Sequence, residues 1–259
     1  MTAPMPTNVV KMPRMSRFSV MAAPKRCAHQ LVSPCNTCEV RDFAACAPLS
    51  ADEQSRLVSI MSTVEVPAHQ PIFEEADPAD HVYNVTSGAV KIYKLLPDGR
   101  RQITGFLLPG DFLGLTHKEA YAYSAEALAP TKLCRFPRRK LEGLLDEMPK
   151  LEQRLLGMAS HELAAAQDQM MLLGRKSAKE RVASFLLMMS AAAVRRGKPA
   201  DPVALPMNRS DIADYLGLTI ETVSRTFTQL RTQKLIELMD EKQIRLLNPE
   251  ALHEIAGGF

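Results

Sequence analysis

A helix, a turn and a second helix are predicted by one stretch near the C-terminus, Asn208-Arg-Ser-Asp-Ile-Ala-Asp-Tyr-Leu-Gly-Leu-Thr-Ile-Glu-Thr-Val-Ser-Arg225. Asn208 and Asp211 have the spacing of a capping box, in which each side chain bonds the backbone N–H of the other residue, so a helix is expected to begin there. Gly217 provides the turn, and Thr219 is expected to cap the second helix. This order of elements is typical of a helix-turn-helix.

The segments on both sides of this stretch complete a domain. A helix is predicted from Ala178 to Arg196, because Gly197 and Pro199 follow it. Residues 236–247 have a polar middle and predict a two-stranded hairpin, or wing. Residues 176–259 are therefore predicted to form a winged helix-turn-helix, a fold that places its second helix in the major groove of double-stranded DNA.

The second helix carries side chains suited to reading DNA bases. Glu221, Ser224 and Arg225 are spaced i, i+3 and i+4, so they share one face at the start of the helix. An arginine can bind guanine O6 and N7 together, a glutamate can accept from cytosine N4, and a serine can bond a base or a phosphate. Taken alone, Glu221 and Arg225 would be read as a solvated ion pair, but the helix-turn-helix pattern around them favours DNA contact. The same candidate DNA-binding set includes three further polar or basic residues: Arg209, Thr219 and Thr222.

Local charge agrees with a DNA-binding domain. The net charge of the whole chain, +3, is too small to indicate nucleic-acid binding. From Arg175 to Lys234, however, there are eleven basic and five acidic residues, a net of six positive charges. Such a surplus on a small domain suits contact with phosphates.

Residues 138–175 are predicted to form one long dimerisation helix. Only Pro149 and Gly157 interrupt its helical period. Apolar residues recur there at steps of three and four, as in the a and d positions of a coiled coil. They are Leu156, Ala159, Leu163, Ala166, Met170 and Leu173. A helix packed on its own domain has the same period, but a seam this narrow, with alanines in it, favours close packing against a second copy and predicts a homodimer.

The N-terminal half has the pattern of short strands. From about Val64 to Pro137, apolar runs are separated by turn signals such as Ser87-Gly88 and Pro109-Gly110-Asp111. Residues 51–137 are predicted to form an antiparallel β-roll of the cupin-like, cyclic-nucleotide-binding type. The expected fold class is therefore α+β: a β-roll, a long helix and a winged helix-turn-helix.

Five cysteines indicate metal or redox chemistry, because their number is odd and nothing points to export. Cys35 and Cys38 form a C-x-x-C pair, Cys46 follows after seven residues, and Cys134 lies far downstream. Four thiolates can hold tetrahedral zinc or an iron–sulfur cluster, and two are enough for a thiol–disulfide switch. Spacing alone leaves these three alternatives open, and Cys134 taken singly reads as a buried barrel cysteine. Cys27 is predicted to be a spare thiol.

Composition excludes several protein classes. The chain is 46% hydrophobic and 24% charged, as globular proteins are. It has no apolar run near the roughly 18 residues that cross a bilayer, so a soluble, cytoplasmic protein without membrane contact is expected. Residues 1–26 are predicted to be a disordered basic tail, and residues 27–50 a cysteine segment. No phosphate-binding glycine loop, nucleophile elbow or histidine-rich metal motif occurs, so no enzyme is predicted.

The β-roll, long helix and winged helix-turn-helix together resemble the CRP-FNR superfamily of bacterial transcription regulators, over roughly residues 35 to 255. Two stretches are similar to its fumarate-and-nitrate-reduction (FNR) branch, Gln102-Ile-Thr-Gly-Phe106 and Asp211 to Arg225. This resemblance implies a regulator that dimerises and binds palindromic promoter sites of anaerobic or microaerobic genes, and that releases DNA when oxygen degrades its cluster.

The resemblance also implies a cofactor and its ligands. In the FNR branch, N-terminal cysteines and one barrel cysteine hold a [4Fe-4S] cluster. Carried over to matching positions, the ligands are Cys35, Cys38, Cys46 and Cys134. The seven-residue gap before Cys46 differs from the shorter gap in enteric members, but it is similar to a variant in other proteobacterial ones.

Two further expectations concern partners. Members that sense cyclic nucleotides carry a Glu and then an Arg-Ser pair after the Gly-Asp-Phe-Leu-Gly turn. Here that turn continues into Leu115-Thr116-His117, and the later pair reads Tyr123-Ser124, so the arginine that would bind a cyclic phosphate is missing and no cyclic nucleotide is expected. The loop Asp98-Gly99-Arg100 resembles a family surface that touches RNA polymerase, although its residues alone would also suit an ordinary exposed turn.

Overall fold

The computed structural model describes residues 34–116, 118–240 and 242–257. The predicted basic tail 1–26 and Cys27 lie outside the described residues. The chain begins in the described part with a 3-10 turn, η1 (Pro34–Thr37), and helix α1 (Ala51–Ile60). None of the described helices is long and apolar enough to span a membrane.

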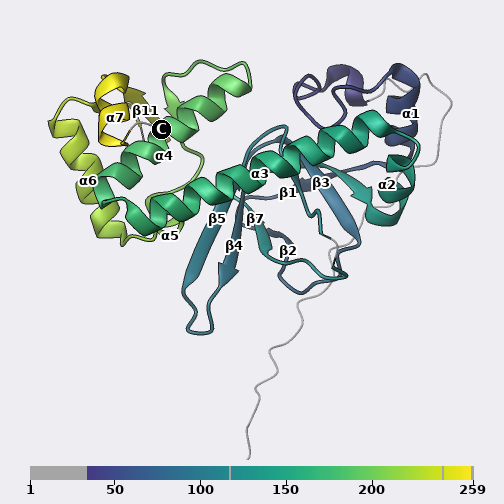
Figure 1. The fold of residues 1–259 in the computed structure, drawn as a ribbon, viewed down its shortest axis with the longest axis horizontal. Helices are drawn as coiled ribbons and strands as arrows, with labels where there is room; N and C mark the ends of the chain where they lie inside the picture. Colours follow the sequence, from purple (N-terminus) through teal and green to yellow (C-terminus); the bar gives the residue numbers. More distant parts are fainter. Residues whose placement is uncertain (1–33, 117, 241, 258–259) are drawn as a thin grey trace, which may run out of the picture. The chain divides into compact units, whose positions relative to one another are not determined.

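Eight strands follow α1 and form two antiparallel sheets (Figure 1). The strands are β1 (Ser62–Val66), β2 (Pro71–Phe73), β3 (His81–Ser87), β4 (Val90–Leu95), β5 (Arg101–Leu107), β6 (Phe112–Leu113), β7 (Ser124–Ala127) and β8 (Thr131–Pro137). One sheet has the order β1-β8-β3-β6 and the other β2-β7-β4-β5. Buried side chains from both sheets, including Val85, Val90 and Leu133, fill the space between them. The predicted β-roll is confirmed.

The expectation of one continuous helix over residues 138–175 is wrong. The structure has two helices, α2 (Arg138–Leu145) and α3 (Pro149–Arg175). Pro149 has no backbone N–H and its ring would clash with the carbonyl of the preceding turn, so inside a helix it would kink or break it. It lies instead at the start of α3, where the missing N–H costs no hydrogen bond.

The C-terminal domain has the predicted winged helix-turn-helix. Its elements are α4 (Ala178–Arg195), β9 (Val203–Ala204), α5 (Arg209–Leu216), α6 (Ile220–Thr232), β10 (Ile236–Leu238), β11 (Gln243–Leu246) and α7 (Pro249–Ile255). The capping box of Asn208 and Asp211 is present, and Thr219 accepts a hydrogen bond from the Thr222 N–H. Gly217 ends α5 with φ 60°, a left-handed conformation that glycine adopts without strain. The wing gains a third strand, β9, which pairs with β11.

A buried network of charges joins the β-roll to α5. The Lys91 ammonium on β4 lies 2.9 Å from Glu126 Oε1 on β7 and 3.0 Å from Asp211 Oδ1 on α5. The side chains of Lys91 and Asp211 are 4% and 2% exposed. Arg101 on β5 adds ion pairs to Asp211 at 3.2 Å and to Asp214 at 2.8 Å. Two carboxylates of α5 and two cations of the sheet therefore fix α5 against the β-roll.

Apolar and amide contacts surround this network. The Phe106 ring on β5 lies 5.1 Å from the Tyr215 ring and 6.1 Å from the Phe185 ring, measured between centroids. The Gln102 side-chain amide donates to the carbonyls of Asp214 and Tyr215 at 2.8 and 3.3 Å. The buried Lys91–Asp211 pair therefore lies in a medium of low polarity, whereas Arg101 and Asp214 remain partly exposed.

Lys91→Met is expected to destabilise the protein by about 3 kcal/mol, because it removes the cation that the buried Asp211 and the partly buried Glu126 share and leaves Asp211 with Arg101 alone. Urea unfolding followed by circular dichroism measures this loss. Lys94→Met is the matched control: Lys94 lies on the same strand, and its ion pair with Glu75 is exposed. That change should cost no more than about 1 kcal/mol. Equal losses in the two variants would contradict the role of the buried network.

Candidate functional site

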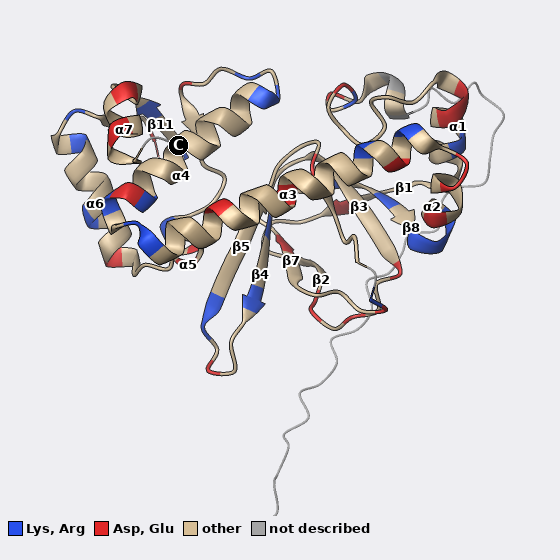
Figure 2. Ribbon diagram, in the orientation of Figure 1, with Lys and Arg blue, Asp and Glu red and all other residues tan. Residues whose placement is uncertain are grey.

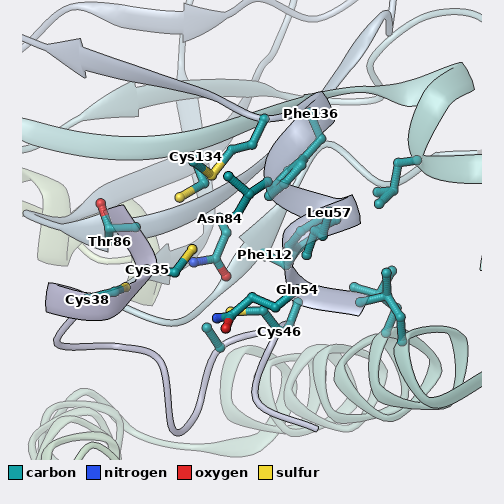
Figure 3. A pocket seen from close by; sticks show the side chains of 17 residues that line it. Cys35, Cys38, Cys46, Gln54, Leu57, Asn84, Thr86, Phe112, Cys134 and Phe136 are labelled. Carbon is teal, nitrogen blue, oxygen red and sulfur yellow. The ribbon is translucent and has the colours of Figure 1, made fainter. Parts of the chain in front are cut away.

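The four predicted cysteine ligands lie around one pocket (Figure 3). Cys35 and Cys38 are on η1 and the turn that follows it, Cys46 precedes α1, and Cys134 is on β8. The pocket is otherwise lined mainly by apolar side chains, among them Leu57, Phe112, Phe136, Leu141, Leu151 and Leu155. The structure therefore brings together residues that are about a hundred positions apart in sequence.

The cysteine segment is held on the roll by its own apolar residues. Val40, Ala44 and Ala45 are buried. The Phe43 ring lies where a Cβ at Gly110 would be, so this turn of the roll has room for the ring only because residue 110 is a glycine. Arg154 on α3 donates a hydrogen bond to the Phe43 carbonyl at 2.5 Å. The segment that carries three cysteines is thus fixed to both the β-roll and α3.

Burial and mutual electrostatic repulsion affect the pKa values of the cysteine thiols. Burial raises the pKa of Cys134 to about 12, and the neighbouring Cys38, Cys35 and Cys46 raise it further. Burial also raises the pKa of Cys46, with additional contributions from Cys35 and Cys38. A low-dielectric site disfavours several thiolates next to one another. A bound cationic group is the partner that would stabilise them in the charged form.

The arrangement is not that of a compact site for a single ion. Among the described residues, no three His, Cys, Asp or Glu side chains lie close enough together to hold one metal ion. The cysteines surround an enclosed void of about 30 Å³, which is room for about two water molecules.

Two buried polar atoms in the pocket have no hydrogen-bond partner among the described residues, Gln54 Nε2 and Asn84 Oδ1. Gln54 was not predicted as a site residue, yet the sequence contained a signal for it. On α1 it occupies the same face as Leu57 and Val58, at positions i, i+3 and i+4, and Met61 follows at i+7 just after the helix ends. A glutamine in such an otherwise apolar stripe indicates that its amide makes a hydrogen bond in a buried place.

The predicted DNA-reading residues share one surface of α6. Glu221, Ser224 and Arg225 are exposed, while Val223 and Phe227 on the opposite face are buried. Thr219 and Thr222 bond each other at the start of the helix. Figure 2 shows Lys and Arg on α6 and around α5. The exposed positions of these side chains fit base and phosphate contact.

Arg209 differs from the other members of this set. Its guanidinium lies 3.5 Å from the centre of the Phe227 ring. Burial lowers its pKa from the ordinary value. A stacked, half-buried arginine is held by this cation–π contact, so it braces α5 against α6 as well as presenting charge near the helix start.

The predicted dimer seam is exposed in the single chain. Leu156, Leu163 and Met170 are 66%, 61% and 65% exposed. Ala159 and Ala166 are exposed as well. Leu173, the last member of the seam, is half-buried against the core of the C-terminal domain. Five of the six seam residues thus form a stripe on α3 that the chain itself does not cover.

Two families match this chain. Residues 63–148 match the cyclic nucleotide-binding domain, and residues 180–255 match the Crp-like helix-turn-helix domain. The first covers most of the β-roll and α2, and the second covers the C-terminal domain. The match to the first family establishes the fold of the roll.

Known proteins similar to the chain are transcription regulators. The transcriptional activatory protein AadR of Rhodopseudomonas palustris is 42% identical over 86% of this chain and 93% of its own length. The transcriptional activator protein FnrL of Cereibacter sphaeroides is 36% identical over 86% of this chain and 92% of its own. The solved structure of FixK2 from Bradyrhizobium japonicum has a TM-score of 0.71 and 43% identity, and covers 76% of this chain and 97% of that one.

These relatives are regulators and not enzymes, and CRP-family regulators bind DNA and act as dimers. The fold, the two matched domains and the extent of the identity agree. The chain belongs to the CRP-FNR family of DNA-binding transcription activators.

Proposed function

We propose that this regulator responds to oxygen through a [4Fe-4S] cluster bound by Cys35, Cys38, Cys46 and Cys134. With the cluster intact, the chain dimerises and binds palindromic promoter sites of anaerobic or microaerobic genes. The observation that carries the proposal is the convergence of four thiols, from two distant segments, on one apolar pocket. Similarity to FixK-type and Fnr-type regulators identifies the regulator class, while the signal is our inference from the pocket.

Four thiols from two segments around a mainly apolar pocket give a donor set that suits a four-iron cluster or a tetrahedral zinc ion. The resemblance of the chain to the FNR branch favours the cluster. Metal and sulfide analysis of the purified protein distinguishes the two.

The cluster, when bound, supplies an oxygen-labile link between the cysteine segment and β8. Residues of the chain connect the position of this segment to helix α3. Arg154 ties the Phe43 carbonyl to α3, so the position of the cysteine segment bears directly on that helix. Leu156, on the same helix, belongs to the seam. If the cysteine segment moves when the cluster is lost, α3 would change with it. The equilibrium between monomer and dimer would then shift, as a ligand shifts a two-state equilibrium.

DNA recognition follows from α6. A dimer places two such helices about 34 Å apart, one turn of DNA, and this spacing selects a palindromic site. Arg225 is placed to bind a guanine edge, and Glu221 to accept from a cytosine. Contacts of the remaining basic residues with phosphates would position the domain without reading sequence.

Cyclic nucleotides are not the signal in this proposal. Aromatic rings fill the interior of the roll: the Phe73 and Tyr121 ring centroids lie 3.7 Å apart, and the Tyr83 ring stacks on Phe73 at 5.9 Å. The Tyr123 hydroxyl accepts a hydrogen bond from the Gly114 N–H. The packed rings leave the interior of the roll filled, and the arginine that would bind a cyclic phosphate is missing. Both observations support a roll that serves as a scaffold and not as a nucleotide-binding site.

RNA polymerase is the proposed protein partner of the loop between β4 and β5. Asp98 and Arg100 form an ion pair there at 2.8 Å, and both side chains are exposed. Since the family members similar to this chain are activators, a surface for the transcription machinery is required. This loop is the part of the roll that resembles such a surface.

Protein purified without oxygen should be brown and contain about four irons and four sulfides per chain. Admission of air should bleach it and weaken DNA binding. Cys134→Ser should abolish the colour, whereas Cys27→Ser, which changes the cysteine outside the proposed ligand set, should leave it unchanged. Absorbance, iron and sulfide assays measure this. A colourless protein with one zinc, or one whose DNA binding returns with reductant alone, would refute the cluster.

Arg225→Ala should weaken binding to a cognate palindrome by about 1–3 kcal/mol, roughly 5- to 150-fold, and relax sequence preference. Fluorescence anisotropy with cognate and scrambled duplexes measures both effects. Arg231→Ala, an exposed arginine at the other end of α6, is the control. It should affect both duplexes alike. Equal loss on both duplexes for Arg225→Ala would show a phosphate contact instead.

Leu163→Glu should convert the dimer to a folded monomer. Each protomer loses a buried leucine worth about 1.5–3 kcal/mol and gains a carboxylate facing its symmetry mate. Sedimentation velocity measures the mass, and circular dichroism checks the fold. Met171→Glu is the control, because Met171 is equally apolar and exposed on α3 but lies off the seam. A monomer from both variants, or from neither, would argue against the seam.

A further inference from the structure

Gln54 places an amide donor inside the cysteine pocket. Its side chain is 8% exposed, and its Nε2 has no hydrogen-bond partner among the described residues. Figure 3 shows the amide in the same pocket as the four cysteines. A buried donor without a partner destabilises the folded state. Such a cost indicates that the donor serves the group that the pocket binds.

The backbone of α1 keeps this amide where it is. Ser50 and Glu53 form a capping box, and the Gln54 N–H donates to the Ser50 carbonyl at 2.9 Å. The first turn of the helix therefore has a fixed direction. Leu57 and Val58, on the same face of α1, and Met61, just after the helix, line the same pocket. The backbone that carries Gln54 is therefore fixed against the pocket, and its side chain is buried there.

The second orphaned atom is chemically different. Asn84 lies directly opposite Cys134 in the pairing of β3 with β8. Its Nδ2 already donates to the Val85 carbonyl at 3.3 Å, and the atom without a partner is the acceptor Oδ1. An acceptor does not bond sulfur that carries negative charge. Asn84 Nδ2 already bonds a backbone carbonyl, whereas Gln54 Nε2 bonds none of the described residues, so Gln54 is the stronger donor for sulfur in this pocket.

We propose that Gln54 is a positioning residue of the metal centre, with its Nε2 donating a hydrogen bond to a sulfur of the cluster held by the four cysteines. The inference rests on the proposed function. Hydrogen bonds to sulfur draw electron density away from the cluster, and they are one of the ways in which proteins set a cluster's reduction potential. Gln54 thereby raises the potential and slows the bleaching of the cluster in air.

The test compares Gln54→Met with the wild-type protein, both purified without oxygen. Methionine keeps the length and shape of glutamine but has no donor. Met61→Leu is the matched control, a volume-conserving change in the same wall of the pocket. Iron content is assayed first. The reduction potential by spectroelectrochemistry, the Fe–S stretching bands by resonance Raman and the rate of bleaching in air then follow.

We expect Gln54→Met to hold its cluster at a more negative potential, with shifted Fe–S bands and bleaching about tenfold faster, within the range seen for outer-shell partners of metal sites. Met61→Leu should behave as the wild type does. Gln54→Asn keeps the amide on a shorter side chain and should retain part of the wild-type potential.

Different outcomes separate the two proposals. A wild-type protein without iron would overturn the proposed function and this inference with it. A loaded wild type with a Gln54→Met variant of equal potential and equal Fe–S bands would overturn the role of Gln54 alone. Should Gln54→Met load no iron while folded, with Met61→Leu fully loaded, the amide is required for binding. If Gln54→Met does not fold, the test uses the reduction potential of Gln54→Asn. A potential between those expected with and without the hydrogen bond supports the inference, and a potential equal to that of the wild type would overturn it.

Discussion

The Lys91 ammonium, buried between two carboxylates, is the constraint on which the arrangement of this protein depends. It joins β4 to β7 through Glu126 and the β-roll to the C-terminal domain through Asp211. Buried ion pairs gain little net stability, since desolvation offsets most of the attraction. They are sensitive to geometry, however, because an unpaired buried charge is costly. The network therefore selects one orientation of α5 against β5.

Helix α3 connects the two sites of the molecule. Near its beginning Arg154 donates to the Phe43 carbonyl of the cysteine segment. Near its end the Gln169 amide donates to the Tyr215 carbonyl of α5 at 2.7 Å. The Tyr215 carbonyl also accepts from Gln102, the first residue of the stretch that resembles the FNR branch. A single helix thus contacts the pocket at one end and the DNA-binding domain at the other, with the predicted dimer seam between them.

Local features of the fold could be predicted from sequence, because their causes lie within a few residues. The capping box of α5, the Gly217 turn and the start of α6 are of this kind. Pro149 carried a local signal too, but the helical period around it obscured the break between α2 and α3. The strand β9 has only two residues and no period to detect.

The sites depended on contacts that no local pattern contains. Lys91 and Asp211 are 120 positions apart, so their pairing follows from the docking of two domains. Cys134 joined the other cysteines only through resemblance to a family, and the structure then placed all four at one pocket. Gln54 stands out in the sequence as a polar residue in the apolar stripe of α1. Its role could be inferred only after the structure showed that this stripe lines the cysteine pocket.

Asp211 has two tasks at once, and this limits how freely such regulators can exchange parts. One carboxylate oxygen accepts the Asn208 N–H that starts α5, and the other accepts from Lys91. A chimera that joined this C-terminal domain to a foreign roll without a cation at that position would still form the helix. It would also enclose a carboxylate with no counter-charge. In this architecture, therefore, a β-roll and its C-terminal domain can be exchanged together as a matched pair, but neither can be exchanged alone.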